Sequence, residues 1–175
     1  MKNTLLIILL ISLISCNNAE KKVNETPTIN QEIPVEKELT VSMEFKSNKE
    51  DELVFMLNDV VVDEFQKKNI HIFEKIIPTT TSDSFEGSFG VNNISNKFII
   101  SLGKNELKEI EILAINFKYG DKSVSVSPKD LEKYFALSKF SVLDTVSYKI
   151  TTRKVDNYHD PRLYMRKKLM DELTQ

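Results

Sequence analysis

The stretch "LTVSMEFK" (residues 39–46) decides the fold class of this chain. Its apolar residues, Leu39, Val41, Met43 and Phe45, alternate with polar ones along the whole stretch. A period of two is typical of a β-strand with one face buried and the other in solvent. We therefore expect a half-buried strand here, and partners for it elsewhere in the chain.

Further strand patterns follow with turn residues between them. They are "ELVFMLND" (52–59), "NIHIFEKII" (69–77), "FEGSFGV" (85–91), "NKFIISLG" (96–103), "LKEIEILAINFKY" (107–119), "SVSVS" (123–127), "KFSVLD" (139–144) and "TVSYKITTR" (145–153). In residues 107–119 the apolar positions change face, which predicts a β-bulge near Ile112 and Leu113. The sequence "YGDK" (119–122) predicts a tight hairpin turn.

Two short helices are also expected. In "SPKDLEKYF" (127–135), Ser127 is placed as N-cap, Pro128 at the first helical position and Asp130 three residues after the cap, so a helix is predicted near 128–136. In the tail, Asp160 and Pro161 predict the start of an amphipathic helix near 161–173. Many short strands without β-α-β alternation favour a mainly β protein, an antiparallel, jelly-roll-like β-sandwich.

Three segments carry a resemblance: "KEIEILAINFKYGDKSVSV", "LEKYFALSKFSVLD" and "NYHDPRLYMRKKLMDEL", between Lys108 and Leu173. Together they resemble uncharacterised lipoproteins of Bacteroidota. The resemblance implies a jelly-roll domain with an Ile-rich bulged strand, a Lys-Tyr-Phe helix and an Asp-Pro helix near the end. It implies no site residues.

The N-terminal region has a different character. Residues 5–14 are apolar apart from Ser12, a length that is typical of a signal peptide and about half of what a membrane-spanning helix needs. "LISC" (13–16) looks like a bacterial lipobox, which implies that Cys16, the only cysteine, becomes the lipid-modified N-terminus. An ordinary cleaved signal with an incidental cysteine is the alternative.

The chain therefore divides into three predicted regions: a signal peptide (1–15), a lipidated cysteine with a disordered tether (16–38), and a β-sandwich domain (39–175). The tether is expected because residues 17–38 are polar, contain Pro27 and Pro34 and show no periodicity. We expect a bacterial cell-envelope protein, held by lipid in the outer membrane, with the side that it faces left open.

Few residues suggest chemistry. His71 lies inside a strand pattern, and His159 lies in "DNYHDPR" (156–162), where Asp160 is already explained as a helix cap. The sequence contains no zinc-type His/Cys spacing, no nucleophile elbow and no phosphate-binding loop, so no cofactor or metal is predicted. The formal net charge of −2, without a basic cluster, argues against nucleic acid.

These observations favour a non-catalytic binding or accessory module for a glycan or an envelope protein. With no Trp present, tyrosines near turns are the candidate platforms for a sugar, namely Tyr119 and Tyr158, and His159 adjoins the second. Two alternatives stay open. One is an envelope hydrolase with a pair of carboxylates, and the other is a purely structural envelope lipoprotein.

Overall fold

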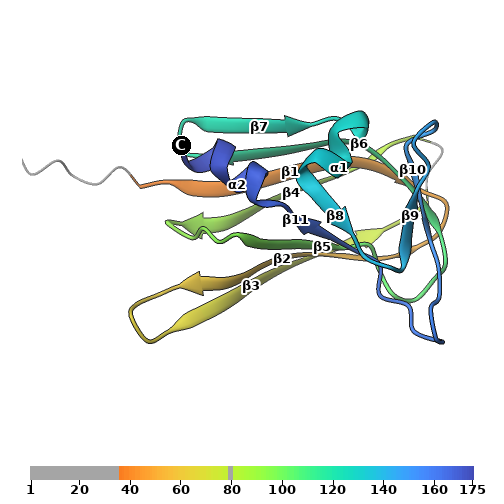
Figure 1. The fold of residues 1–175 in the computed structure, drawn as a ribbon, viewed down its shortest axis with the longest axis horizontal. Coiled ribbons are helices and arrows are strands. Elements are labelled where there is room, and N and C mark those ends of the chain that lie inside the picture. Colours follow the sequence, from red (N-terminus) through yellow and green to blue (C-terminus); the bar gives the residue numbers. More distant parts are fainter. Residues whose placement is uncertain (1–35, 79–80) are drawn as a thin grey trace, which may run out of the picture. The chain divides into compact units, whose positions relative to one another are not determined.

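Two antiparallel sheets face each other across a shared core in the computed structural model, which describes residues 36–78 and 81–175 (Figure 1). The first sheet has the order β4 (Asp83–Val91), β1 (Glu38–Ser47), β6 (Glu109–Tyr119), β10 (Lys149–Thr152) and β9 (Ser141–Leu143), and β7 (Lys122–Val126) also pairs with β6. The second has the order β3 (Lys67–Ile76), β2 (Asp51–Val61), β5 (Lys97–Ser101), β11 (Arg162–Met165) and β8 (Phe135–Leu137). The predicted β-sandwich is confirmed.

The core is built from the inward faces of the alternating strands. Val41, Met43 and Phe45 of β1 are buried, as their period of two predicts. Between the sheets, the rings of Phe55 and Phe85 stack with centroids 3.6 Å apart. Each fully buried large side chain stabilises the fold by about 1.5–3 kcal/mol. Burial of these aromatic and aliphatic side chains therefore holds the two sheets together.

Two local predictions about β6 are confirmed. Glu44 of β1 pairs with Ala114 and the next residue, Phe45, pairs with Ile112, so Leu113 is the extra residue of a β-bulge. At the end of the strand, Gly120 has φ +62° and begins the two-residue turn into β7. That left-handed conformation favours glycine, which has no Cβ to clash with the backbone.

The first predicted helix is present but ends early. A 3₁₀ turn (η1, Pro128–Asp130) runs into α1 (Leu131–Tyr134), and Phe135 then enters β8. The hydroxyl of Ser127 donates to the carboxylate of Asp130 over 2.6 Å.

The second predicted helix is wrong in its first part. Residues 162–165 form strand β11, and α2 spans only Lys167–Thr174. Leu163 pairs with Ile100 of β5 and with Leu137 of β8, so β11 fills the space between two strands that would otherwise leave their backbone groups unpaired. Pairing with distant strands therefore outweighs the local helix-start signal of Asp160 and Pro161.

The two ends of the sandwich differ in what they carry. The chain enters β1 at Glu38, and we call this end of the sandwich the entry end (Figure 1). After a short connection at the opposite end, β2 runs back toward the entry end, so the β2–β3 turn lies there too. The 102–108 loop and the 153–161 segment lie at the opposite end, next to the start of β2. Cys16 and the predicted signal peptide and tether fall outside the described residues.

Candidate functional site

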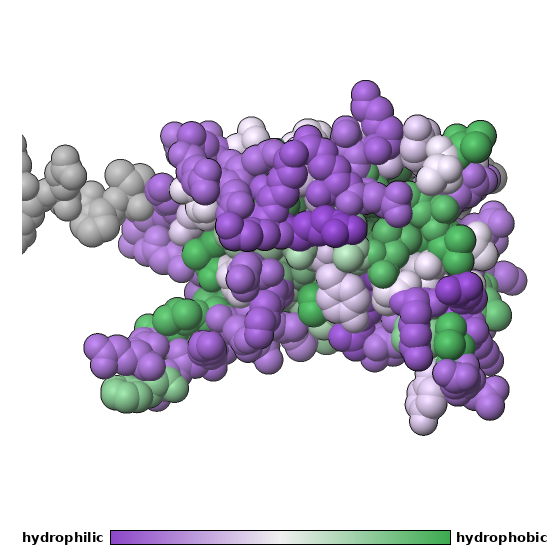
Figure 2. All heavy atoms as spheres, in the orientation of Figure 1, coloured by the Kyte–Doolittle hydropathy of each residue, from purple (hydrophilic) through white to green (hydrophobic). Residues whose placement is uncertain are grey.

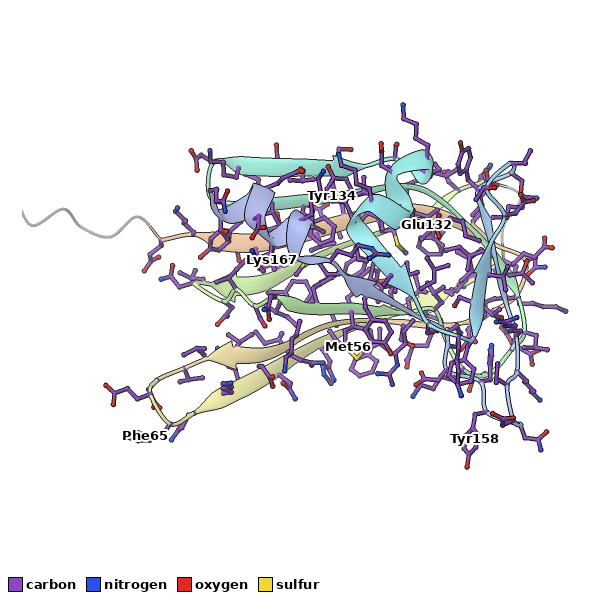
Figure 3. All side chains as sticks on the ribbon, in the orientation of Figure 1. Met56, Phe65, Glu132, Tyr134, Tyr158 and Lys167 are labelled. Carbon is purple, nitrogen blue, oxygen red and sulfur yellow. The ribbon has the colours of Figure 1, made fainter. Side chains whose placement is uncertain are left out.

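The structure separates the residues that the sequence singled out. Tyr119 lies at the entry end, half-buried against the core, with the ammonium of Lys37 5.8 Å from its ring centre. Tyr158 and His159 lie at the opposite end, where Figure 3 shows Tyr158 pointing outward. Tyr119 therefore does not share a site with the other two.

Tyr158 is presented by a tight turn. Val155 and Tyr158 exchange two backbone hydrogen bonds of 2.9 and 3.0 Å, and Asp156 and Asn157 between them have φ of 52° and 64°. Positive φ at both central residues defines a type I′ turn, which Asn and Asp tolerate best after glycine. Tyr158 is 74% exposed at the end of this turn, so its ring is free to make contacts.

His159 fixes a neighbouring loop. Its Nδ1 donates a hydrogen bond to the carbonyl oxygen of Lys104 over 2.9 Å, because a carbonyl oxygen only accepts. The ammonium of Lys104 also lies 3.5 Å from a carboxylate oxygen of Asp160. His159 and Asp160 thus fix the position of the 102–108 loop.

The same loop is anchored on its inner side by a buried ion pair that the sequence analysis missed. The carboxylate of Asp51 and the ammonium of Lys108 are in contact, with exposed side-chain fractions of 1% and 0%. Asp51 also accepts hydrogen bonds from the backbone N–H groups of Glu52, Asn105 and Glu106, at 2.8, 3.1 and 3.2 Å, and from the Asn105 side chain at 3.0 Å. Lys108 donates to the carbonyl oxygen of Leu102 over 3.0 Å.

The pKa values of the pair follow from these contacts. Burial raises the pKa of Asp51, but hydrogen bonds from Lys108, Glu52 and Glu106 outweigh it and hold that pKa below its ordinary value. Burial lowers the pKa of Lys108 below its ordinary value, and the hydrogen bond with Asp51 opposes this only in part. Asp51 therefore stays charged and accepts hydrogen bonds, and it is poorly suited to transfer protons.

Gly103 is required by this cluster. Its φ is +89°, and a Cβ placed on it would lie 2.4 Å from Cγ of Asp51 and 2.6 Å from Nζ of Lys108. No real Cβ approaches so closely, so only glycine allows the loop to pass over the ion pair.

Beyond the ion pair, a shallow hollow opens on the outer face of the second sheet. It has a volume of about 280 Å³ and adjoins another of about 380 Å³. The lining of the first combines apolar, polar and charged groups: Asp51, Glu52, Val54, Phe73, Ser101, Gly103, Lys104 and Asn105. The second shares Asp51, Glu52 and Asn105 and adds Glu50, Lys75 and Glu106.

Phe73 is the unusual member of the hollow. It is 59% exposed, on an outward-facing position of β3, and it pairs in register with Val54 of β2. The row that contains Phe73 continues through Val54 of β2 to Ser101 of β5. Next to it, Met56 of β2 pairs with His71 of β3 and with Ile99 of β5, which pairs with Tyr164 of β11. Figure 3 shows Met56 on the outer side of β2. The hollow therefore lies beside a row of apolar side chains on the outer face of the sheet.

A buried hydroxyl also borders the hollow. Ser101 is only 2% exposed, and its Oγ has no hydrogen-bond partner among the described residues. Buried polar groups are nearly always paired, so this hydroxyl is an exception, and it lies beneath the surface of the hollow.

Metal-binding and membrane-spanning features were also sought in the described ranges. Within residues 36–78 and 81–175, no group of three or more His, Cys, Asp or Glu side chains is arranged to hold a metal ion. Within the same ranges, no helix has the length and apolar character that crossing a bilayer requires. No family model, curated protein or solved structure matches this chain.

One sequence signal could have indicated the hollow, although the sequence analysis did not use it. In residues 69–77 the inward positions are Ile70, Ile72 and Ile76, so Phe73 falls on the face of His71 and Lys75. A single exposed apolar residue is common on protein surfaces, so this position becomes a candidate contact only together with the groups around it. The ion pair gave no such signal, since its members are 57 residues apart.

Proposed function

We propose that this chain is a lipid-anchored envelope protein whose β-sandwich is a non-catalytic module that binds a glycan through the Phe73 hollow. The observation that carries the binding proposal is the exposed ring of Phe73 among hydrogen-bonding side chains. Sugars present apolar C–H faces and a rim of hydroxyls, so they fit an aromatic platform flanked by carboxylate, amide and ammonium groups.

The polar groups of the hollow are positioned for such a ligand. Lys104 and Asn105 are on the 102–108 loop, which Asp51 and His159 hold through hydrogen bonds. Glu52 lies on β2 beside them. A pre-ordered set of donors and acceptors binds with less loss of side-chain freedom than a mobile set.

The non-catalytic part of the proposal is supported by the state of the buried carboxylate. Asp51 is ion-paired with Lys108 and accepts four further hydrogen bonds from N–H groups. A general acid or base needs a pKa close to the working pH, whereas the pKa of Asp51 is held below its ordinary value. Asp51 therefore serves to order the hollow.

The anchor is supported by the sequence of residues 5–16. The apolar run is too short to span a bilayer, and the lipobox-like "LISC" places Cys16 directly after it. A single acyl chain gives only marginal membrane binding, because each buried CH₂ contributes about 0.8 kcal/mol, so several chains on one cysteine are needed for a durable anchor.

The anchor is tested by Cys16→Ala in cells grown with a palmitate analogue. The wild type should take up the label and fractionate with membranes, and the alanine variant should stay as an unprocessed precursor or appear in the soluble fraction. Label on the alanine variant would show that lipid is attached elsewhere and would overturn the assignment of Cys16.

The hollow is tested by screening the purified mature chain against a glycan array and measuring the affinity of the best ligand. Phe73→Ala should weaken that affinity by on the order of tenfold or more, because it removes the platform. Phe65→Ala is the matched control, since Phe65 is also an exposed phenylalanine but lies at the entry end. Equal losses in both variants, or in neither, would contradict binding at Phe73.

A further inference from the structure

The outer part of the β2–β3 hairpin is the most exposed apolar feature of the described structure. Phe65 is 92% exposed at the turn, with Val61 and Val62 at 65% and 53% beside it. Figure 2 shows green, hydrophobic spheres among purple ones on this hairpin, and Figure 3 shows Phe65 at its outermost point. We call Val61, Val62 and Phe65 the hairpin tip.

The hairpin projects beyond the sheet that supports it. β5 pairs with β2 only as far as Asn58, so the residues after Asn58 have β3 as their strand neighbour (Figure 1). A β-bulge at Asp59, which has φ +55°, shifts the register there. Bulges increase the local twist and redirect the residues that follow. Val60 remains buried, and Val61 and Val62 turn to the surface.

The tip is also held in a defined shape. The carboxylate of Asp63 accepts hydrogen bonds from the backbone N–H groups of Phe65 and Gln66, both 2.8 Å long, and the N–H of Val62 donates to the carbonyl oxygen of Gln66 over 2.9 Å. An ordered turn presents an apolar side chain without a further loss of backbone freedom on contact. The phenyl ring of Phe65 therefore projects from a fixed support.

The charges around the tip balance each other. Asp63 and Glu64 precede Phe65, and Lys67 and Lys68 follow it. The tip therefore has no net attraction for a charged partner, and its apolar side chains supply the driving force for any contact. A few apolar side chains with a lysine-containing rim suit the boundary between lipid headgroups and acyl chains.

The position of the tip relative to the chain's entry favours a membrane as its partner. Glu38 begins β1 at the entry end, where the tip also lies. Roughly twenty residues separate Cys16 from that point, and a chain of that length can span at most some tens of ångströms, at about 3.3 Å per residue. An anchor raises the local concentration of the membrane at the tip, so weak apolar contacts suffice.

We propose that the hairpin tip inserts Phe65, with Val61 and Val62, into the surface of the membrane that anchors the chain, as a second and orienting contact. This inference rests on the proposed lipid anchor at Cys16. It assigns to the β2–β3 hairpin a role that is separate from the Phe73 hollow. The sandwich would then stand on the membrane with its entry end down.

The test uses the full-length, lipid-modified chain reconstituted in protein-free vesicles of phosphatidylethanolamine and phosphatidylglycerol. A polarity-sensitive dye is attached through Glu64→Cys, beside the tip, or through Tyr158→Cys, at the turn of the opposite end. Acyl-chain quenchers should reduce the fluorescence of the dye at position 64 and not at position 158. Adding Phe65→Ser to Glu64→Cys should lower the inserted fraction by on the order of tenfold. Adding Val146→Ser, which changes a similarly exposed apolar residue between β9 and β10, should leave the inserted fraction unchanged.

The outcomes are distinguishable. Equal quenching at both positions, or quenching that does not respond to Phe65→Ser, would overturn insertion of the tip. Shielding of position 64 in native membranes only, with cross-linking to a protein, would assign the tip to a protein partner and also overturn it. Failure of the anchor is read separately, because wild-type chain with lipidated Cys16 has no free thiol. Reaction of the mature wild type with a maleimide would show that the anchor itself is absent.

Discussion

Breaking the buried Asp51–Lys108 pair should strongly lower the free energy of unfolding. Both side chains are essentially inaccessible, so Lys108→Met leaves the carboxylate of Asp51 charged and buried. Removing one partner of a buried pair costs about 3–5 kcal/mol. Asp51 would retain N–H donors from Glu52, Asn105 and Glu106, and hydrogen bonds to a charged group contribute about 1.5–3 kcal/mol each. We therefore expect a loss of about 3 kcal/mol.

The reverse variant should be the more damaging one. In Asp51→Asn, the ammonium of Lys108 retains the Leu102 carbonyl and a neutral amide, so we expect a loss near 5 kcal/mol. Burial already lowers the pKa of Lys108, and without Asp51 it should fall further. Between the folded and unfolded pKa values of Lys108 the unfolded chain binds more protons, so stability rises with pH. The deficit of Asp51→Asn should therefore shrink as the pH is raised toward 10.

Urea unfolding of the mature chain, followed by circular dichroism, measures these losses. Lys167→Met is the matched control, because Lys167 pairs with Asp171 over 3.4 Å on the exposed side of α2 and should cost less than about 1 kcal/mol. The double variant Asp51→Asn/Lys108→Met should be more stable than the sum of the single losses by about 2 kcal/mol or more. If Lys108→Met unfolds at the same urea concentration as Lys167→Met, the pair does not stabilise the fold and the reasoning fails.

Three further outcomes follow from the same contacts. Gly103→Ala should lower the urea midpoint strongly, because its Cβ would overlap the ion pair, and a midpoint equal to wild type would contradict the close approach. In acid, the stability that the lowered pKa of Asp51 contributes is complete above about pH 4 and should be lost as the pH falls through its folded value, which a pH series of urea midpoints checks. Phe65→Ser should change the unfolding free energy by less than about 0.5 kcal/mol, since its ring is exposed, and a larger loss would show that the tip packs on the fold.

The features that sequence predicted correctly are those whose causes are local. The strand at 39–46 follows from its own alternation, and the bulge at Leu113 follows from a change of face within a single strand. The turn at Gly120 follows from a residue that tolerates positive φ. In each case the side chains that determine the conformation lie within a few positions of it.

The features that were missed depend on distant partners. The "DPRLYM" segment begins with helix-start residues, yet it forms a strand because β5 and β8 offer unpaired edges on either side. The two strands missed in this way, β8 and β11, are neighbours in the second sheet. The Asp51–Lys108 pair likewise exists only after β2 and the loop before β6 meet. The outward position of Phe73 could be read from the sequence, but the polar groups beside it come from β2 and the 102–108 loop.

One hairpin connects the two surfaces to which we assign roles. Phe73 pairs with Val54 near the start of β2, and Val61 ends the same strand, so at about 3.3 Å per residue the hollow and the hairpin tip are roughly 20 Å apart. If the tip rests on the membrane, the strand holds the hollow above the headgroups, within reach of glycans outside the lipid layer. Because each surface depends on its own phenylalanine, Phe65→Ser should lower the inserted fraction about tenfold and preserve glycan affinity. Phe73→Ala should weaken glycan affinity about tenfold or more and preserve insertion. A variant pair that failed to separate the two activities would show that the hairpin is a single binding surface.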